Sequence, residues 1–131
     1  MERFQISTPE QTVMINITAR VQGIIDEKGY KNGFCQVFIP HTTAAVTINE
    51  NADPDVKHDI ITEINKVIPF NDGYHHIEGN SAAHIKTSLL GSSELIPVDQ
   101  GRLKLGTWQG IFFCEFDGPR RREVWVQFLG V

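Results

Sequence analysis

Apolar residues recur along this chain with two different periods, and the two periods predict different elements. A period near two predicts strands over residues 3–7, 13–15, 34–39, 45–48, 94–98, 103–105, 107–116 and 123–129. A period of three to four predicts helices over residues 16–28 and 54–67. Residues 34–39 are nearly all apolar, which is typical of a central strand covered on both faces. The order of these elements predicts an α+β fold with a largely antiparallel or mixed sheet and two main helices.

The second predicted helix has clear boundary signals and a clear apolar face. Asp53 can accept hydrogen bonds from the first free N–H groups, and Pro54 suits the first helical position, where no donor is needed. The predicted buried stripe consists of Val56, Ile60, Ile64 and Val67. His58 lies about 200° round the helix from Val56, so we expect it to face solvent.

Residues 70–93 are the least regular part of the chain. Loops of this length in a compact domain are usually functional or disordered, and the apolar content of this one argues against disorder. One or two helical turns are predicted from Ala82 to Leu90, with Gly91 ending them.

Composition narrows the class of protein. The chain has 131 residues, which suits one domain over residues 1–131, and 40% of them are apolar. The net charge of −4 gives no sign of a nucleic-acid or membrane partner, and no leader or membrane span is seen, so we expect a cytoplasmic location. Cys35 and Cys114 both sit in strand-like apolar runs, where buried free thiols are more common than a disulfide.

The stretch from Ile39 to Val56 is the first candidate for a functional site. It combines a strand end, a polar corner at His41, Thr42 and Thr43, a second strand and a helix N-terminus. Polar side chains between apolar runs favour a site. Two threonines after a proline are also ordinary turn chemistry, so both interpretations stay open.

Two further groups of side chains have possible chemistry. Four histidines lie outside the second helix, namely His41, His75, His76 and His84, and three convergent imidazoles would leave an open position on zinc. Their spacing matches no known zinc motif, so loop histidines that cap backbone carbonyls are the alternative. Alternation turns Arg120 and Arg122 to one side and Arg121 to the other, which suits a phosphate group or merely a solvated turn. Residues 79–81 lead into the short predicted helix, whose N-terminus would favour an anion.

Four segments in this order closely resemble the YjbQ-like family, also called secondary thiamine-phosphate synthase enzyme proteins. They are PHTTAAVTINENADPDV, YHHIEGNSAAHIK, SLLGSSELIPV and LGTWQGIFFCEFDGPRRR, and the similarity is dense from about Phe34 onward. The resemblance implies a compact α+β domain that assembles as a homotrimer. It also implies a pocket with a divalent metal, zinc in the first place, with magnesium as the alternative for a diphosphate substrate.

The resemblance assigns roles to particular residues. In the family pattern Y-x-H-x-E-G-N the histidine corresponds to His76, so the implied metal ligands are His41, His76 and His84, and His75 is a spacer. For such a pocket, Glu78 is the nearest candidate base or supporting partner, and we expect Asn49 and Asp53 to orient the histidines or close the pocket. The expected substrate-binding residues are Thr42, Thr43, Asn80, Ser81, Lys86, Arg120 and Arg122.

The activity implied by the resemblance is a weak thiamine-phosphate synthase reaction, in which hydroxymethylpyrimidine diphosphate condenses with thiazole phosphate. Two other classes use the same residues. One is a non-catalytic trimer that binds a metal or a small phosphorylated metabolite. The other is a metal-dependent hydrolase of a phosphorylated metabolite.

Overall fold

The computed structural model describes all 131 residues and contains two antiparallel sheets. The five-stranded sheet has the order β1 (Glu2–Ser7), β8 (Arg121–Gly130), β3 (Gly33–Phe38), β5 (Ser93–Asp99) and β6 (Arg102–Leu103). The three-stranded sheet has the order β2 (Val13–Asn16), β7 (Gln109–Glu115) and β4 (Ala44–Glu50). All strand pairs are antiparallel. The predicted α+β class is confirmed, but the strands form two sheets where one was expected.

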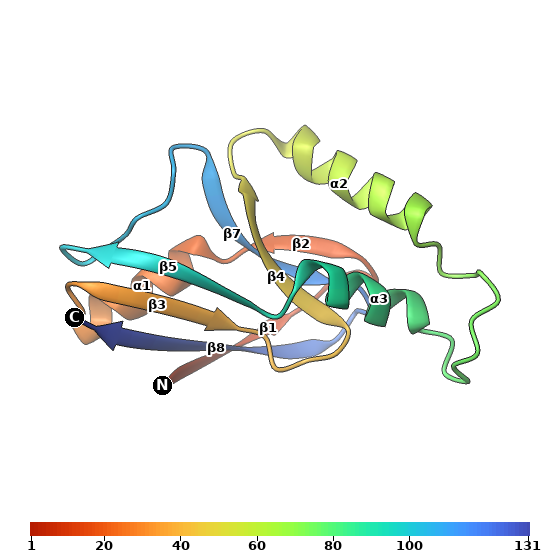
Figure 1. Cartoon of the computed structure of the whole chain (residues 1–131), viewed down its shortest axis with the longest axis horizontal. Helices are drawn as coiled ribbons and strands as arrows, with labels where there is room; N and C mark the ends of the chain where they lie inside the picture. Colours follow the sequence, from red (N-terminus) through yellow and green to blue (C-terminus); the bar gives the residue numbers. More distant parts are fainter.

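Three helices complete the layers: α1 (Thr18–Lys28), α2 (Pro54–Val67) and α3 (Ser81–Leu90). The main core lies between the two sheets and also receives Val21 and Ile25 from α1 (Figure 1). A smaller core lies on the opposite face of the three-stranded sheet, where α2 and α3 cover β7 and β4. β7 is therefore buried on both faces, and its odd-numbered and even-numbered residues belong to different cores.

Local signals explain where the helices begin and end. Asp53 accepts a hydrogen bond from the Asp55 N–H at 2.9 Å, so α2 begins where its cap and Pro54 predict. Gly29 ends α1 with a positive φ of 67°, a conformation that costs glycine little. The third helix was predicted as one or two turns between Ala82 and Leu90, and it forms one continuous helix over nearly the same span, Ser81–Leu90. It is continuous because Ala82 and Ala83 are both buried, Ala83 in the smaller core, and this packing supplies stability that local propensity does not.

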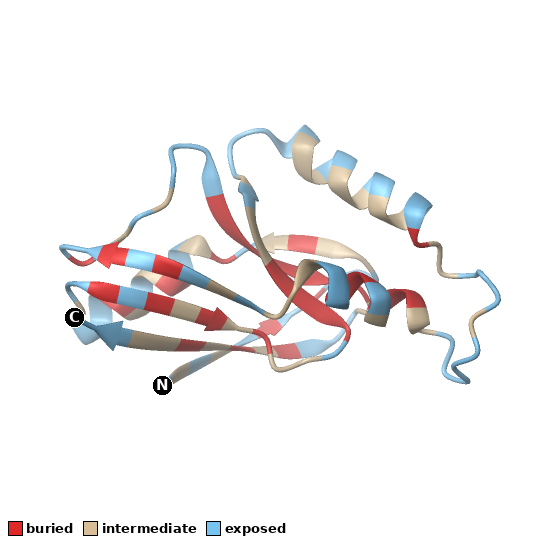
Figure 2. Cartoon of the chain, in the orientation of Figure 1, coloured by how far each residue is buried: buried red, intermediate tan, exposed pale blue.

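The predicted buried stripe of α2 is only half-buried. None of the fourteen residues of α2 is buried, and Val67, at the end of the stripe, is 68% exposed (Figure 2). Ile60 and Ile64 touch the edge of the smaller core, but no other layer of the chain lies over the helix. The prediction was wrong in degree because the periodicity of a helix shows which face is apolar and not how much that face is covered.

The outer face of the five-stranded sheet is open in the same way. β3 lies centrally between β8 and β5, and Cys35 and Val37 are fully buried on its inner face. Phe34 on its outer face is 40% exposed. The expectation that both faces of this strand are covered was therefore wrong within a single copy of the chain. Cys35 and Cys114 are buried free thiols as predicted, and burial raises their pKa values to about 11 and about 12. No helix is long and apolar enough to cross a membrane.

Candidate functional site

A cavity of about 590 Å³ lies where the core between the two sheets ends. It is bounded by the end of β3, the corner after it, the turn between β7 and β8, and the N-terminal part of α3 together with the segment before that helix. Its polar lining comprises His41, Thr42, Thr43, His76, Glu78, Asn80, His84, Ser92, Asp117, Arg120 and Arg122. The apolar contribution comes from residues 38–40. The cavity is therefore mainly suited to a polar ligand.

Two strands place an ion pair between Arg122 and Glu115 at the inner end of this cavity, because their side chains alternate between the two faces of each sheet. Arg122 precedes Val124 on the inner face of β8, and Glu115 follows Phe113 on the inner face of β7. A side-chain period of two therefore points both charged groups into the space between the sheets. Their side chains are only 6% and 0% exposed, respectively.

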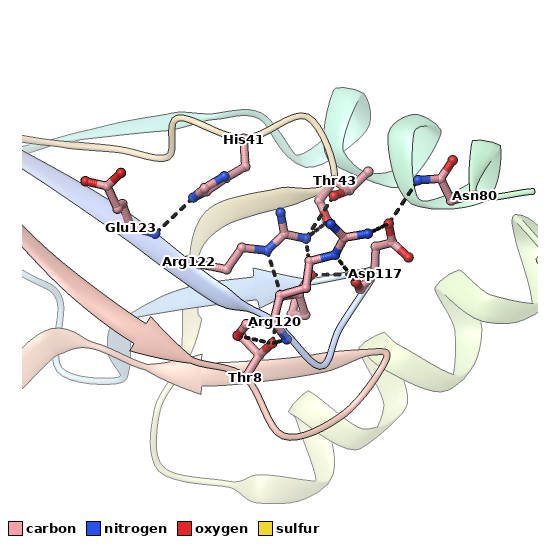
Figure 3. A network of polar contacts seen from close by, with 9 residues as sticks. Thr8, His41, Thr43, Asn80, Asp117, Arg120, Arg122 and Glu123 are labelled. Atoms are coloured by element: carbon pink, nitrogen blue, oxygen red, sulfur yellow. Dashed lines mark hydrogen bonds and ion pairs between the residues drawn. The ribbon is translucent and has the colours of Figure 1, made fainter. Parts of the chain in front are cut away.

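The guanidinium of Arg122 is fixed by the carboxylate of Glu115 and the hydroxyl of Thr43. Its Nε donates to Glu115 Oε1 at 2.8 Å, and its Nη2 donates to the second oxygen of the same carboxylate and to Thr43 Oγ1 at 2.8 Å (Figure 3). Thr8 also donates to Glu115 Oε1 at 2.8 Å, so the carboxylate is held from a further side. The Nη1 atom of Arg122 makes no hydrogen bond within the chain, and Arg122 lines the cavity. One edge of a rigid cation is thus left for a ligand.

The rim of the cavity is tied together by Asp117. Arg120 donates from Nη2 to Asp117 Oδ2 and from Nε to the Asp117 carbonyl, at 2.9 and 2.8 Å. Asn80 donates to the same carboxylate at 2.9 Å, and its own Oδ1 is buried without a partner. This contact joins the turn before β8 to the start of α3. That helix has neither an acidic residue in its first turn nor a side-chain cap, so its N-terminus retains partial positive charge.

His41 is anchored to the neighbouring strand. The backbone N–H of Glu123 donates to His41 Nε2 at 2.9 Å (Figure 3). Burial, aided by the positive charge of Arg122, lowers the pKa of His41 below its ordinary value, although Glu115 and Glu123 oppose the shift. The ring is therefore a neutral group at the cavity wall.

Comparison with known proteins places the chain in a family. The family model described as "UPF0047 protein YjbQ-like" matches residues 2–131. The chain belongs to this family. A UPF0047 protein of Methanocaldococcus jannaschii is 52% identical over 128 residues, which cover 98% of this chain and 93% of that protein. The UPF0047 protein YugU of Bacillus subtilis is 47% identical over 131 residues, or 99% of each chain.

Solved structures agree with this assignment. A YjbQ/UPF0047 protein of Clostridium acetobutylicum, described as uncharacterized, has 52% sequence identity and a TM-score of 0.96, covering 98% of this chain and all of its own. A YbjQ-like protein of unknown function from Sulfolobus solfataricus has 37% identity and a TM-score of 0.95, covering 99% of this chain and 96% of its own. The membership and fold that the sequence resemblance implied are thus shown, and the names of these YjbQ-like relatives state no reaction.

The three histidines implied as zinc ligands line the same cavity but do not form a metal site as arranged. His76 and His84 lie edge to face with ring centroids 5.6 Å apart. The Nε2 atom of His41 already accepts a hydrogen bond from the backbone N–H of Glu123. No group of three or more His, Cys, Asp or Glu side chains in this YjbQ-like chain is positioned to hold a metal ion. Glu78 Oε1 lies 3.9 Å from His76 Nε2, and the side chain of Glu78 is 73% exposed, so Glu78 is an exposed residue at the rim of the cavity.

Four of the predicted site residues lie elsewhere. Asn49 is an exposed residue of β4 whose side chain accepts from the N–H of Glu50, and Asp53 only caps α2. Lys86 is fully buried, donates to Asn65 Oδ1 at 2.6 Å, and contacts the ring of Phe70 at 4.2 Å. Ser81 lines a neighbouring hollow beside His76 and His84. The structure does not bring Asn49, Asp53 and Lys86 to the cavity, because proximity in sequence to a motif does not set the direction of a side chain.

Sequence reasoning missed three residues of the site: Glu115, Asp117 and Ser92. A signal existed for Glu115, which is the one charged residue in the strongly apolar run IFFCEF. A carboxylate in such a run requires a buried partner, and the arginines five to seven residues later were available. Ser92 and Asp117 have no comparable signal, since both sit in ordinary turn sequences.

Proposed function

We propose that the cavity binds a small phosphorylated metabolite, with Arg122 and Arg120 as the groups that hold its phosphate oxygens. The observation that carries this proposal is the buried guanidinium of Arg122, fixed by Glu115 and Thr43 with Nη1 left unpaired. A planar cation that is already oriented loses little conformational freedom when a ligand arrives, so it is suited to oxyanion binding.

The surroundings of Arg122 fit the same ligand. Arg120 also has an Nη1 atom without a partner in the chain, and the exposed residue Thr42 lines the cavity as well. The N-terminus of α3 adds backbone donors and the positive end of a helix dipole. Because Glu115 and Asp117 each neutralise one arginine, we expect selection for a compact anion that uses directed hydrogen bonds, rather than for any polyanion.

The candidate reaction at this site is the condensation implied by the family resemblance. In that reaction the thiazole nitrogen attacks the methylene carbon of hydroxymethylpyrimidine diphosphate, the carbon–oxygen bond breaks, and pyrophosphate leaves with the electron pair. Arg122 and Arg120 would stabilise the charge that develops on the departing pyrophosphate. No step of this proposal uses a metal, and a metal-dependent hydrolase gains no support from the arrangement of the histidines.

Calorimetry with pyrophosphate tests the binding proposal directly. We expect saturable binding of one pyrophosphate per chain, weakened by added inorganic phosphate, which competes for the same donors. Absence of binding at millimolar pyrophosphate would refute the proposal. Single-turnover formation of thiamine phosphate from the two half-molecules then separates a synthase from a binding protein, because binding without product would leave only the latter.

A further inference from the structure

The tautomer of His41 follows from its one hydrogen bond. Its Nε2 lies 2.9 Å from the backbone nitrogen of Glu123, which donates its only proton to that atom. A ring nitrogen that accepts a hydrogen bond carries no proton itself, so in the neutral imidazole the proton is on Nδ1. The charged groups that face the ring are Arg122, Glu115 and Glu123, and together with burial they leave the pKa of His41 lowered.

The protonated edge of the ring has no partner in the chain. Nδ1 makes no hydrogen bond to any other residue, and His41 lines both the main cavity and the smaller polar hollow beside His84 and Ser92. The other edge is fixed to β8, so the ring has little freedom to turn. A donor with a fixed direction is therefore presented at the wall of the cavity that Arg122 also lines.

We propose that His41 is a hydrogen-bond donor that offers Nδ1–H to an oxygen atom of the ligand, and is neither a zinc ligand nor a proton-accepting base. Zinc at Nδ1 would force the proton onto Nε2, where it would face the N–H of Glu123 across 2.9 Å. Zinc at Nε2 would require that hydrogen bond to break. A phosphoryl oxygen requires neither change. The choice of ligand rests on the proposed function, whereas the tautomer does not.

Nitrogen NMR of the full chain with ¹⁵N-labelled histidine tests the tautomer. The signal of His41 is identified as the one lost in His41→Gln. We expect a protonated Nδ1, an unprotonated Nε2, and no change in this pair when one equivalent of zinc chloride is added. A proton on Nε2, or a zinc-induced shift of either nitrogen of His41, would overturn the proposal.

Two substitutions of His41 separate the role of Nδ1, the proposed donor to the ligand, from that of Nε2, which accepts from Glu123. The amide nitrogen of asparagine reaches about the position of Nδ1, and the carbonyl oxygen of glutamine reaches that of Nε2. We expect His41→Asn to keep pyrophosphate affinity within about threefold while its melting temperature falls, since Glu123 loses an acceptor. We expect His41→Gln to keep its melting temperature and lose roughly tenfold or more in affinity.

The crossed pattern distinguishes the donor role from the alternatives. A merely structural histidine would make affinity follow stability, so that Gln would bind better than Asn. A ligand or base role would weaken both variants equally. Either result would contradict the proposal. If the wild-type chain does not bind pyrophosphate at all, the proposed function fails, while the NMR experiment still decides the tautomer.

Discussion

Arg122 on β8 and Glu115 on β7 form an ion pair that closes the core between the two sheets. The Nε atom of Arg122 lies 2.8 Å from Glu115 Oε1, and Thr8 and the Asp117 N–H donate to the same carboxylate. The pair therefore has two structural roles. It satisfies the polar groups at the end of an apolar core, and it fixes the cation that faces the cavity.

Removal of one partner of this pair should be costly. Glu115→Ala leaves the guanidinium of Arg122 buried without a counter-ion, so we expect the free energy of unfolding to fall by about 3–5 kcal/mol. Urea denaturation measures the change. The matched control is Glu63→Ala, which removes an exposed pair with Lys66 at 3.8 Å and should cost no more than about 1 kcal/mol. Similar losses for both variants would contradict the assigned role of Glu115.

The two neighbouring arginines offer a test of phosphate binding that conserves charge. Arg120 lines the cavity, whereas Arg121 begins β8 on the opposite side and is exposed. Arg120→Lys removes the planar fork, so we expect pyrophosphate affinity to fall roughly ten- to a hundredfold, equivalent to about 1.5–3 kcal/mol. Arg121→Lys should bind as the wild type does. Equal affinities for all three proteins in calorimetry would mean that the arginines form only a solvated turn.

Sequence periodicity predicted the elements well and the layers poorly. The apolar pattern and the capping residues predicted the observed bounds of α2. The family resemblance predicted that His41, His76 and His84 line one pocket, and all three line the main cavity. Periodicity identifies an apolar face but not the element that covers it, which is why Phe34 and the stripe of α2 were expected to be buried. Division of the strands into two sheets depends on long-range pairing, for which a single sequence carries no direct signal.

The candidate site was predicted in part for a similar reason. Alternation alone put Arg120 and Arg122 on one side, and the cavity contains both. Lys86 was assigned to phosphate because it stands in the motif AHIK, two residues after His84. Two residues along a helix turn a side chain through about 200°, so Lys86 faces the interior while His84 faces the cavity. The motif therefore predicted that Lys86 lies near the site, but the direction of its side chain is set by the geometry of the helix.

Lys86 should act on stability and not on ligand binding. Burial lowers the pKa of Lys86, because its ammonium has Asn65 and aromatic rings as neighbours but no carboxylate partner. Its charged form is therefore disfavoured in the folded state, and the wild type gains stability as pH rises from the lowered pKa toward the unfolded value near about 10.4.

The test is Lys86→Met, which retains the apolar contacts without the charge. We expect this variant to be more stable than the wild type near neutral pH in urea denaturation, with a difference that shrinks as pH is raised toward about 10. Its pyrophosphate affinity should stay within about twofold of the wild-type value. Lys66→Met, at a side chain that is 72% exposed, should show no such dependence on pH. A tenfold loss of affinity in Lys86→Met would return this lysine to the site.

Acidification should destabilise the chain through His41. Its pKa is lowered in the folded state, so below about pH 6.5 the unfolded chain takes up the proton more readily than the folded one. The contribution of His41 is complete above that pH and is lost as pH falls to the lowered pKa. His41→Gln lacks this titration, so the unfolding free energy should decline less steeply between about pH 7 and pH 5. Identical slopes for the two proteins in urea denaturation would contradict this.

The open face of the five-stranded sheet should be covered by other copies of the chain. Phe34, Leu95 and Leu129 on three adjacent strands are 40%, 57% and 55% exposed on this face, and Phe34 lies directly opposite Leu129 in the β3–β8 register. Neighbouring apolar side chains of this kind mark interaction surfaces in soluble proteins. The family resemblance implies three copies, and a closed ring would also protect the edges at β1 and β6.

Sedimentation equilibrium at micromolar concentration tests this assembly. We expect the mass of three 14.8 kDa chains for the wild type, since a cyclic trimer closes without free interfaces. Leu95→Glu places a charge in the proposed interface and should shift the protein toward the monomer. Val67→Glu changes an apolar residue that is even more exposed, at the end of α2 and away from the sheet, and should remain trimeric. A monomeric wild type would refute the assembly. A monomer formed by both variants would move the interface away from the sheet face, because the charge at α2 would then act as strongly as the charge at β5.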